Sequence, residues 1–242
     1  MSDCGRTFVH VTHEAARKIG GIGAVLAGFF TSRNYLEKVD RSIVVGPLFE
    51  TCGGVEDRLE NGKVLYSSID DVYNSEYNNV FQRIENIFHT KIVYGLKDFC
   101  DEGTGVESKA EVLLFDVGGI NTGLVDPVKG RMFENFGVAS DKYEHIWEYE
   151  QYVRLAPVAI ETIKQMDAFC GDSYIVAHEF MGMPTALAGK SDPGLEVKTM
   201  FYAHEVATIR LIVEKHPGHD TMFYNALSKA QGEGKYIDEV FG

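Results

Sequence analysis

Short runs rich in β-branched and aromatic residues recur along the chain, and longer stretches with helical patterning separate them. Residues of these types suit a pleated, half-buried surface, so we expect each run to be a strand. Strands that alternate with helices form a mainly parallel sheet with helices on both faces. The pattern therefore predicts a three-layer α/β protein. The expected strands are Arg6 to Val11, Ser42 to Val45, Val64 to Ser68, Lys91 to Tyr94, Val112 to Phe115, Tyr174 to Ala177 and Thr199 to Ala203.

Two stretches have a pronounced helical pattern. Residues 142–169 are expected to form one long or broken helix, in which Pro157 marks a kink or a restart because proline has no backbone N–H to donate. Residues 220–230 are expected to form a second helix, with an aspartate as its cap. Two segments rich in glycine, acids and turn residues, 98–108 and 118–130, are expected to be irregular.

The chain has 242 residues, of which 45% are hydrophobic, and this is enough to bury a substantial core. No internal repeat or Pro/Gly/Ser-rich linker divides it, so we predict a single domain over residues 1–242. The formal net charge of −13 and the isoelectric point near 5.0 oppose binding to nucleic acid, which requires a basic face. The composition thus indicates a globular protein without a nucleic-acid partner.

The cysteines lie about fifty residues apart, at Cys4, Cys52, Cys100 and Cys170. This spacing favours neither a zinc site nor a disulfide framework, and we expect the protein in the reducing cytoplasm. We expect neither a targeting segment nor a membrane span, since no stretch reaches the roughly 20 apolar residues that a span needs. Two histidine pairs, His10 with His13 and His216 with His219, are not accompanied by further ligands, so no metal site is predicted.

A glycine-rich turn separates the first expected strand from an apolar stretch, residues 24–30, that should form a buried helix. In this turn Lys18 precedes the pair Gly20 and Gly21. Glycines let the backbone approach a ligand, and the unpaired N–H groups at a helix start favour negative charge. Lys18 would add a point charge suited to a phosphate. The alternative is a plain strand-to-helix turn with a solvated lysine, because the turn matches neither a Walker loop nor G-x-G-x-x-G.

The last two expected strands each run directly into a histidine and a glutamate, His178 with Glu179 and His204 with Glu205. Open α/β sheets bind ligands at the carboxyl ends of parallel strands. These residues are therefore candidates for a site at the same edge of the sheet as Lys18. The alternative for the first pair is an ordinary polar start of a helix.

The segment from Glu14 to Leu26 resembles the N-terminal motif of glycogen and starch synthases, in which a glutamate, a basic residue and a Gly-Gly pair open the nucleotide-sugar site. It is closer to the animal and fungal glycogen synthases than to the bacterial and plant starch synthases. Further similar segments follow in the family's order, and ordered matches are more specific than any single one. They are Val44 to Leu48, Lys91 to Gly95, Val112 to Gly118 and the two histidine motifs.

The resemblance implies a retaining glycosyltransferase with the GT-B fold, which consists of two Rossmann-like domains, and this chain matches the N-terminal one. It implies transfer of glucose from a nucleotide sugar, UDP-glucose or ADP-glucose, to a glucan acceptor, without a cofactor or a metal. The second domain, which would grip the nucleotide, is absent from residues 1–242. We therefore expect this chain to be inactive by itself.

The resemblance also implies a role for each residue of the expected site. The donor would be bound by Lys18, Gly20, Gly21 and Arg210. The acceptor or the transferred sugar would be bound by Glu14 and His178. The catalytic residues would be His204 and Glu179, and a neutral imidazole at His204 can exchange hydrogen bonds with sugar hydroxyls without carrying a charge.

Two positions depart from the family. Phe180 stands where the family has a tryptophan, and Glu205 stands where it has a small or amide residue, although a carboxylate is unfavourable beside a phosphate-bearing donor. Two other interpretations stay open: a non-catalytic module that binds a carbohydrate or a nucleotide sugar, and an unrelated Rossmann-like ligand-binding protein. A second Rossmann-like domain with a Glu-x7-Glu motif, encoded in frame downstream, would favour the enzyme.

Overall fold

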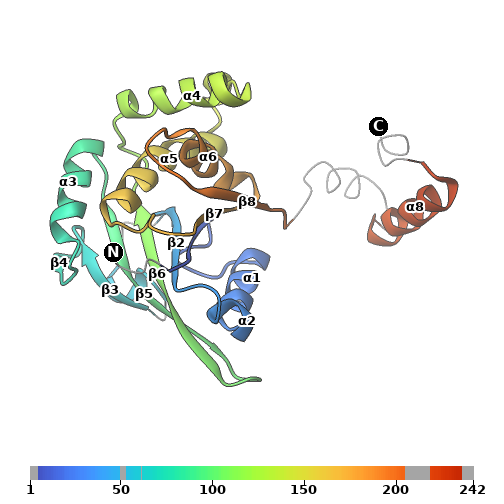
Figure 1. The fold of residues 1–242 in the computed structure, drawn as a ribbon, viewed down its shortest axis with the longest axis horizontal. Coiled ribbons are helices and arrows are strands. Elements are labelled where there is room, and N and C mark those ends of the chain that lie inside the picture. Colours follow the sequence, from blue (N-terminus) through green and yellow to red (C-terminus); the bar gives the residue numbers. More distant parts are fainter. Residues whose placement is uncertain (1–4, 50–52, 61, 205–218, 236–242) are drawn as a thin grey trace. The chain divides into compact units, whose positions relative to one another are not determined.

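The computed structural model describes residues 5–49, 53–60, 62–204 and 219–235 (Figure 1). The chain divides into two compact units, Met1–Tyr202 and Ala203–Gly242, and each is described by itself. The second unit contains helix α8, His219–Glu233, at the position where a helix was expected. The predicted single domain over the whole chain stays a prediction.

The first unit is built on one eight-stranded sheet in the order β4-β3-β5-β6-β2-β1-β7-β8. Five neighbours, from β6 to β8, run parallel, whereas β5 pairs antiparallel with β6 and β3, and β4 pairs antiparallel with β3. The sheet is therefore mixed, and the expected parallel pairing holds for part of it. The strands are β1 (Thr7–Val11), β2 (Arg41–Pro47), β3 (Gly62–Ser67), β4 (Val72–Tyr73), β5 (Ile92–Asp101), β6 (Val106–Phe115), β7 (Ser173–His178) and β8 (Lys198–Tyr202).

Helices flank the sheet on both faces, as the sequence pattern predicts (Figure 1). One face packs against α1 and α2, and the other packs against α3, α5 and α6, on which α4 lies. The alternation of side chains along each strand sorts the two cores: Val9 and Val11 of β1 face α5 and α6, whereas His10 faces α1. The helices are α1 (Gly21–Phe30), α2 (Arg33–Leu36), α3 (Asn78–Phe88), α4 (Asp126–Phe136), α5 (Trp147–Gln165) and α6 (Glu179–Ser191).

The segment 98–108, which we expected to be irregular, is the outer half of a long hairpin. β5 and β6 stay paired as far as Asp101 and Val106, and a turn with Gly105 at a φ of 66° joins them. These strand residues were not predicted because glycines and acids dominate the segment. Phe99 of this hairpin packs on Phe30 of α1, with their ring centroids 4.7 Å apart. Tertiary packing therefore outweighs the weak local strand preference.

The segment 118–130 is also more regular than expected. It contains a 3-10 turn, η2 (Thr122–Leu124), in which the Asn121 side chain accepts a hydrogen bond from the Gly123 N–H, and then the start of α4. Pro127 lies in the first turn of α4, where a missing N–H costs nothing. The residues that signalled a turn are thus the starting signals of two helical elements.

The long helical prediction at 142–169 corresponds to α5, which begins at Trp147 and ends at Gln165. Pro157 lies inside this helix and does not end it. Two other short helical turns are η1 (Val55–Asp57) and η3 (Ser140–Tyr143). In the described part of the chain, no helix is both long and apolar enough to cross a membrane.

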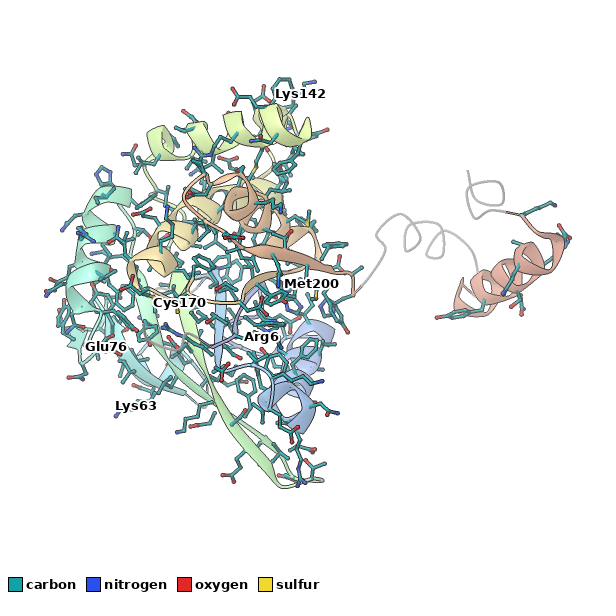
Figure 2. The ribbon with its side chains drawn as sticks, in the orientation of Figure 1. Arg6, Lys63, Glu76, Lys142, Cys170 and Met200 are labelled. Carbon is teal, nitrogen blue, oxygen red and sulfur yellow. The ribbon has the colours of Figure 1, made fainter. Side chains whose placement is uncertain are left out.

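One expectation about the cysteines needs correction. Cys170, labelled in Figure 2, is disulfide-bonded, whereas Cys100 is an exposed free thiol. The sequence did not indicate this bond, because widely spaced cysteines show no pairing pattern. The cytoplasmic location stays a prediction.

Candidate functional site

The ends of β1 and β7 bring two of the predicted motifs to the same edge of the sheet. The strands are parallel neighbours, with Val11 in register with Ala177. The glycine-rich turn, residues 12–20, follows β1, and His178 with Glu179 follows Ala177 directly. Both motifs thus lie at carboxyl ends of parallel strands, where α/β sheets bind ligands.

The buried Glu14 side chain caps the start of α1. Its side chain is only 5% exposed, and its Oε2 atom accepts hydrogen bonds from the backbone N–H groups of Ile19, Gly20 and Gly23, at 2.8, 2.8 and 2.9 Å. Burial alone would raise the pKa of Glu14, but these three N–H groups outweigh it and lower the pKa below its usual value. The position at which the sequence predicts a bound anion is therefore occupied by the chain's own carboxylate.

Glycine at position 23 is required for this arrangement. A Cβ atom on Gly23 would lie 2.7 Å from the Glu14 carboxylate and 2.9 Å from the Lys18 Cα atom. Gly21, by contrast, has no atom within 4 Å of where its Cβ would be. Of the two positions, only Gly23 needs a glycine on steric grounds, and the sequence prediction did not include it.

Lys18 is exposed and lines a cavity of about 220 Å³ between α1 and the β5–β6 hairpin. Within the described part of the chain, no hydrogen bond or ion pair involves its ammonium group. Lys97 and Glu60 line the same cavity. The predicted donor-binding lysine therefore has an open position with a second cation beside it.

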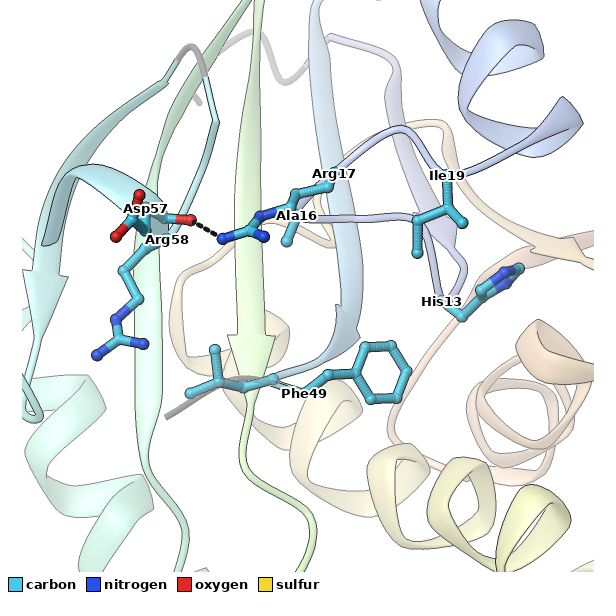
Figure 3. Close-up of a pocket in the computed structure, with 8 residues that line it drawn as sticks. His13, Ala16, Arg17, Ile19, Phe49, Asp57 and Arg58 are labelled. Atoms are coloured by element: carbon cyan, nitrogen blue, oxygen red, sulfur yellow. Dashed lines mark hydrogen bonds between the residues drawn. The ribbon is translucent and has the colours of Figure 1, made fainter. Parts of the chain in front are cut away.

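A second cavity, of about 260 Å³, opens on the other side of the glycine-rich turn (Figure 3). His13, Arg17 and the exposed Phe49 line it, and Arg17 donates a hydrogen bond to the Asp57 carbonyl oxygen at 2.8 Å. One turn therefore contributes residues to two cavities. Sequence reasoning did not select these residues, because lone charged or aromatic residues in loops carry no spacing signal.

Arg58 forms the wall behind this second cavity. Its buried guanidinium group donates two hydrogen bonds to the Asp70 carboxylate, at 2.9 and 3.0 Å, and thereby lowers the pKa of Asp70. Bidentate pairs of this kind fix both side chains. The pair anchors the 53–60 segment to the sheet.

His178 lies inside the protein. Its side chain is 0% exposed, and its Nε2 atom is 2.9 Å from Nδ1 of His10. Nε2 of His10 is in turn 2.9 Å from the Tyr35 hydroxyl, which is 2.9 Å from the Ser42 hydroxyl. Burial, together with the neighbouring His178, holds the pKa of His10 well below its usual range. The result is a chain of hydrogen-bonded polar groups between the sheet and α1–α2.

Glu179 begins α6 with an unusual backbone conformation, at a φ of 57°. Non-glycine residues in this left-handed region are strained and persist where the surroundings impose the conformation. The next turn is tight as well, because a Cβ on Gly182 would lie 2.5 Å from the Ala177 Cα and 2.7 Å from the Val11 carbonyl oxygen. The partly exposed Glu179 is therefore presented on a rigid turn.

Two predicted site residues do not belong to the first unit as it is described. His204 belongs to the second unit, two residues after the end of β8. Arg210 lies outside the described residues. The catalytic role of His204 and the donor-binding role of Arg210 stay predictions.

Comparison with known proteins gives no relative: no protein-family model matches the chain, and no curated protein is significantly similar to it. The resemblance to glycogen and starch synthases thus rests on the motifs themselves.

Proposed function

We propose that this chain is the N-terminal Rossmann-like domain of a retaining GT-B glycosyltransferase that transfers glucose from UDP-glucose or ADP-glucose to a glucan acceptor. The observation that carries the proposal is Lys18, an exposed cation that lines a cavity beside the start of α1, at the carboxyl edge of parallel strands. A second strand end at that edge presents Glu179. The ordered motifs of the sequence supply the reaction class.

In this proposal Lys18 stabilises the diphosphate that leaves the sugar. A preorganised cation lowers a barrier when the charge opposite it grows in the transition state. The Gly20 N–H is already bonded to Glu14, so the side chain of Lys18 carries more of this task than the glycine backbone does. The Glu14 carboxylate holds the turn in shape.

Glu179 would contact the acceptor or the transferred sugar, and the catalytic role of His204 stays a prediction. His178, buried against His10, would act by fixing the turn on which Glu179 stands. Strain at a residue that carries chemistry is a recurrent way to preorganise a site.

Exposed apolar side chains at this edge support a site that needs a second wall. Ile19, Phe49 and Phe180 are exposed by 71%, 54% and 52%, and they lie in the segments that follow β1, β2 and β7. A contiguous apolar patch marks an interaction surface, and in this proposal these three side chains contribute to one. The second nucleotide-binding domain would close on them and complete the cleft.

The test is Lys18→Ala in a polypeptide that also carries the second domain. Loss of a charge-assisted contact to the leaving diphosphate should lower the transfer rate roughly a hundredfold while thermal unfolding stays unchanged. Lys63→Ala removes another exposed lysine and should leave the rate unaltered. A Lys18→Ala enzyme within twofold of the parent would contradict the proposal.

The second candidate is a non-catalytic module that binds a carbohydrate or a nucleotide sugar. It is favoured by Glu14, since this carboxylate occupies the helix start that a catalytic diphosphate would otherwise use. Binding of a nucleotide sugar without any turnover in the two-domain polypeptide would select this candidate.

A further inference from the structure

We infer that Lys97 is the second cation of an anion subsite that it forms with Lys18, and that Glu60 is a built-in counter-ion which the anionic ligand displaces. The inference rests on the proposed function only for the natural ligand, a diphosphate. The cavity, the two lysines and the ion pair are independent of it.

Lys97 is a buried ammonium group on β5, with only 6% of the residue exposed. Its Nζ atom donates to the Ala16 carbonyl oxygen and to Oε2 of Glu60, both at 2.8 Å. Burying a charge is unfavourable unless it is paired and hydrogen-bonded. Two residues after Ala16 the same turn carries Lys18, so Lys97 both fixes this turn and faces the cavity that Lys18 lines.

The charges around the cavity leave one cation unbalanced. The Glu14 carboxylate accepts hydrogen bonds from three backbone N–H groups, and Asp98 is paired with Lys109 at 2.9 Å on the hairpin. Glu60 balances Lys97. Lys18 has no such partner within the described residues, so its ammonium group is available to an anion in the cavity.

Glu60 is the one of these three carboxylates that a ligand can replace at low cost. Its side chain is 40% exposed, and its backbone has a φ of 54°, a conformation that non-glycine residues rarely adopt. A carboxylate oxygen 2.8 Å from a buried ammonium group stands where a phosphate oxygen would bind. If a diphosphate takes that position, Lys97 and Lys18 share it, and Glu60 turns into solvent.

The experiment titrates inorganic pyrophosphate into the 242-residue protein at low salt, followed by NMR chemical shifts or calorimetry. Glu60→Gln should tighten binding about five- to tenfold, because it removes the competing charge and leaves both lysines. Glu56→Gln makes the same charge change on a nearby exposed residue and should alter affinity less than twofold. An unchanged or weaker affinity in Glu60→Gln would overturn the inference.

Lys97 itself is tested in the background that lacks its partner, so that the loss of the lysine does not leave the Glu60 carboxylate unpaired in the cavity. The double variant Glu60→Gln with Lys97→Met should bind pyrophosphate at least tenfold more weakly than Glu60→Gln alone. Lys63→Ala, which removes an exposed lysine that does not line the cavity, should not weaken it. Equal affinity of the double variant and Glu60→Gln would exclude Lys97 from the subsite.

These outcomes separate the inference from the proposed function. Pyrophosphate binding that depends on Lys97, in a polypeptide without sugar transfer, would keep the subsite and reject the transferase. Transfer that depends on Lys18, with no effect of Glu60→Gln on pyrophosphate, would keep the transferase and reject the role of Lys97.

Discussion

The β1–α1 and β7–α6 junctions follow adjacent parallel strands at the same edge of the sheet. They differ in where their polar side chains lie and in what those side chains bind. At β1–α1, residues 12–20 separate the strand from the helix, and Glu14 folds back to cap the helix. At β7–α6 the helix begins directly after the strand, and His178 points into the core.

The length of the connection accounts for the difference. A long turn has room for an internal carboxylate cap and leaves Lys18 exposed beside a cavity. A direct connection has no such room, so the backbone strain falls on Glu179 and the histidine is satisfied by His10. The longer junction thus leaves a cation exposed beside a cavity, and the shorter one places a constrained backbone at Glu179.

The largest effect should come from filling the tight β7–α6 turn. Gly182→Ala would force a Cβ against backbone atoms of β1 and β7, which cannot move without disturbing the sheet. We expect it to lower the free energy of unfolding by about 3 kcal/mol in chemical denaturation. Gly28→Ala in α1 meets no atom within 4 Å and should stabilise the protein slightly. Equal changes in the free energy of unfolding for the two variants would show that the β7–α6 turn is not sterically constrained at Gly182.

An intermediate effect should appear on acidification. His10 is held neutral by burial and by His178, so its folded pKa is below the ordinary 6.5. As pH falls, His10 is therefore protonated at a higher pH in the unfolded chain than in the folded protein. The free energy of unfolding decreases as pH falls below 6.5. The slope reaches about 1.4 kcal/mol per pH unit, or about 2 kcal/mol down to pH 5.

Unfolding free energies measured at several pH values check this. His10→Gln should reduce the slope between pH 6.5 and 5, whereas His145→Gln, at an exposed position, should not. A slope that persists unchanged in His10→Gln would assign the acid sensitivity to other groups.

The smallest effect should come from the cap at β1–α1. Glu14→Gln keeps one acceptor oxygen but removes the charge, and we expect a loss of about 1 kcal/mol at neutral pH. Because the folded pKa of Glu14 is lowered, its contribution is present above pH 4.5 and is lost as pH falls further. The difference between parent and variant should shrink in that range. Glu37→Gln, an exposed substitution, should be neutral at every pH, and a similar loss there would argue against a cap.

Much of the fold could be predicted because the hydrophobic pattern is strong where strands are buried. Each expected run overlaps one observed strand, and each of the three expected helices overlaps an observed one. The antiparallel pairing of β5 could not be predicted, because alternation shows which residues share a face but not which strand lies beside it. β4 was not predicted because a strand of two residues is too short to show an alternation of hydrophobic and polar side chains.

The site could be predicted only as far as a motif marks it. Lys18 and Glu179 stand next to strand ends, and their positions follow from sequence order. Lys97 was missed although a signal exists: counting by twos from the buried Val93 places Lys97 on the same face as Phe99, toward α1. That His178 would pair with His10 could not be foreseen, since the contact joins residues 168 positions apart.

The pairing of β1 with β7 also sets a minimum time between the synthesis of β1 and the completion of its pairing. Thr7 is in register with Ser173, so β1, an interior strand of the sheet, cannot gain its second neighbour until almost the whole first unit has been made. A ribosome that adds roughly 5–20 residues per second needs on the order of ten seconds or more for that stretch. During this interval one edge of β1 has unpaired backbone N–H and C=O groups, which can pair with another chain.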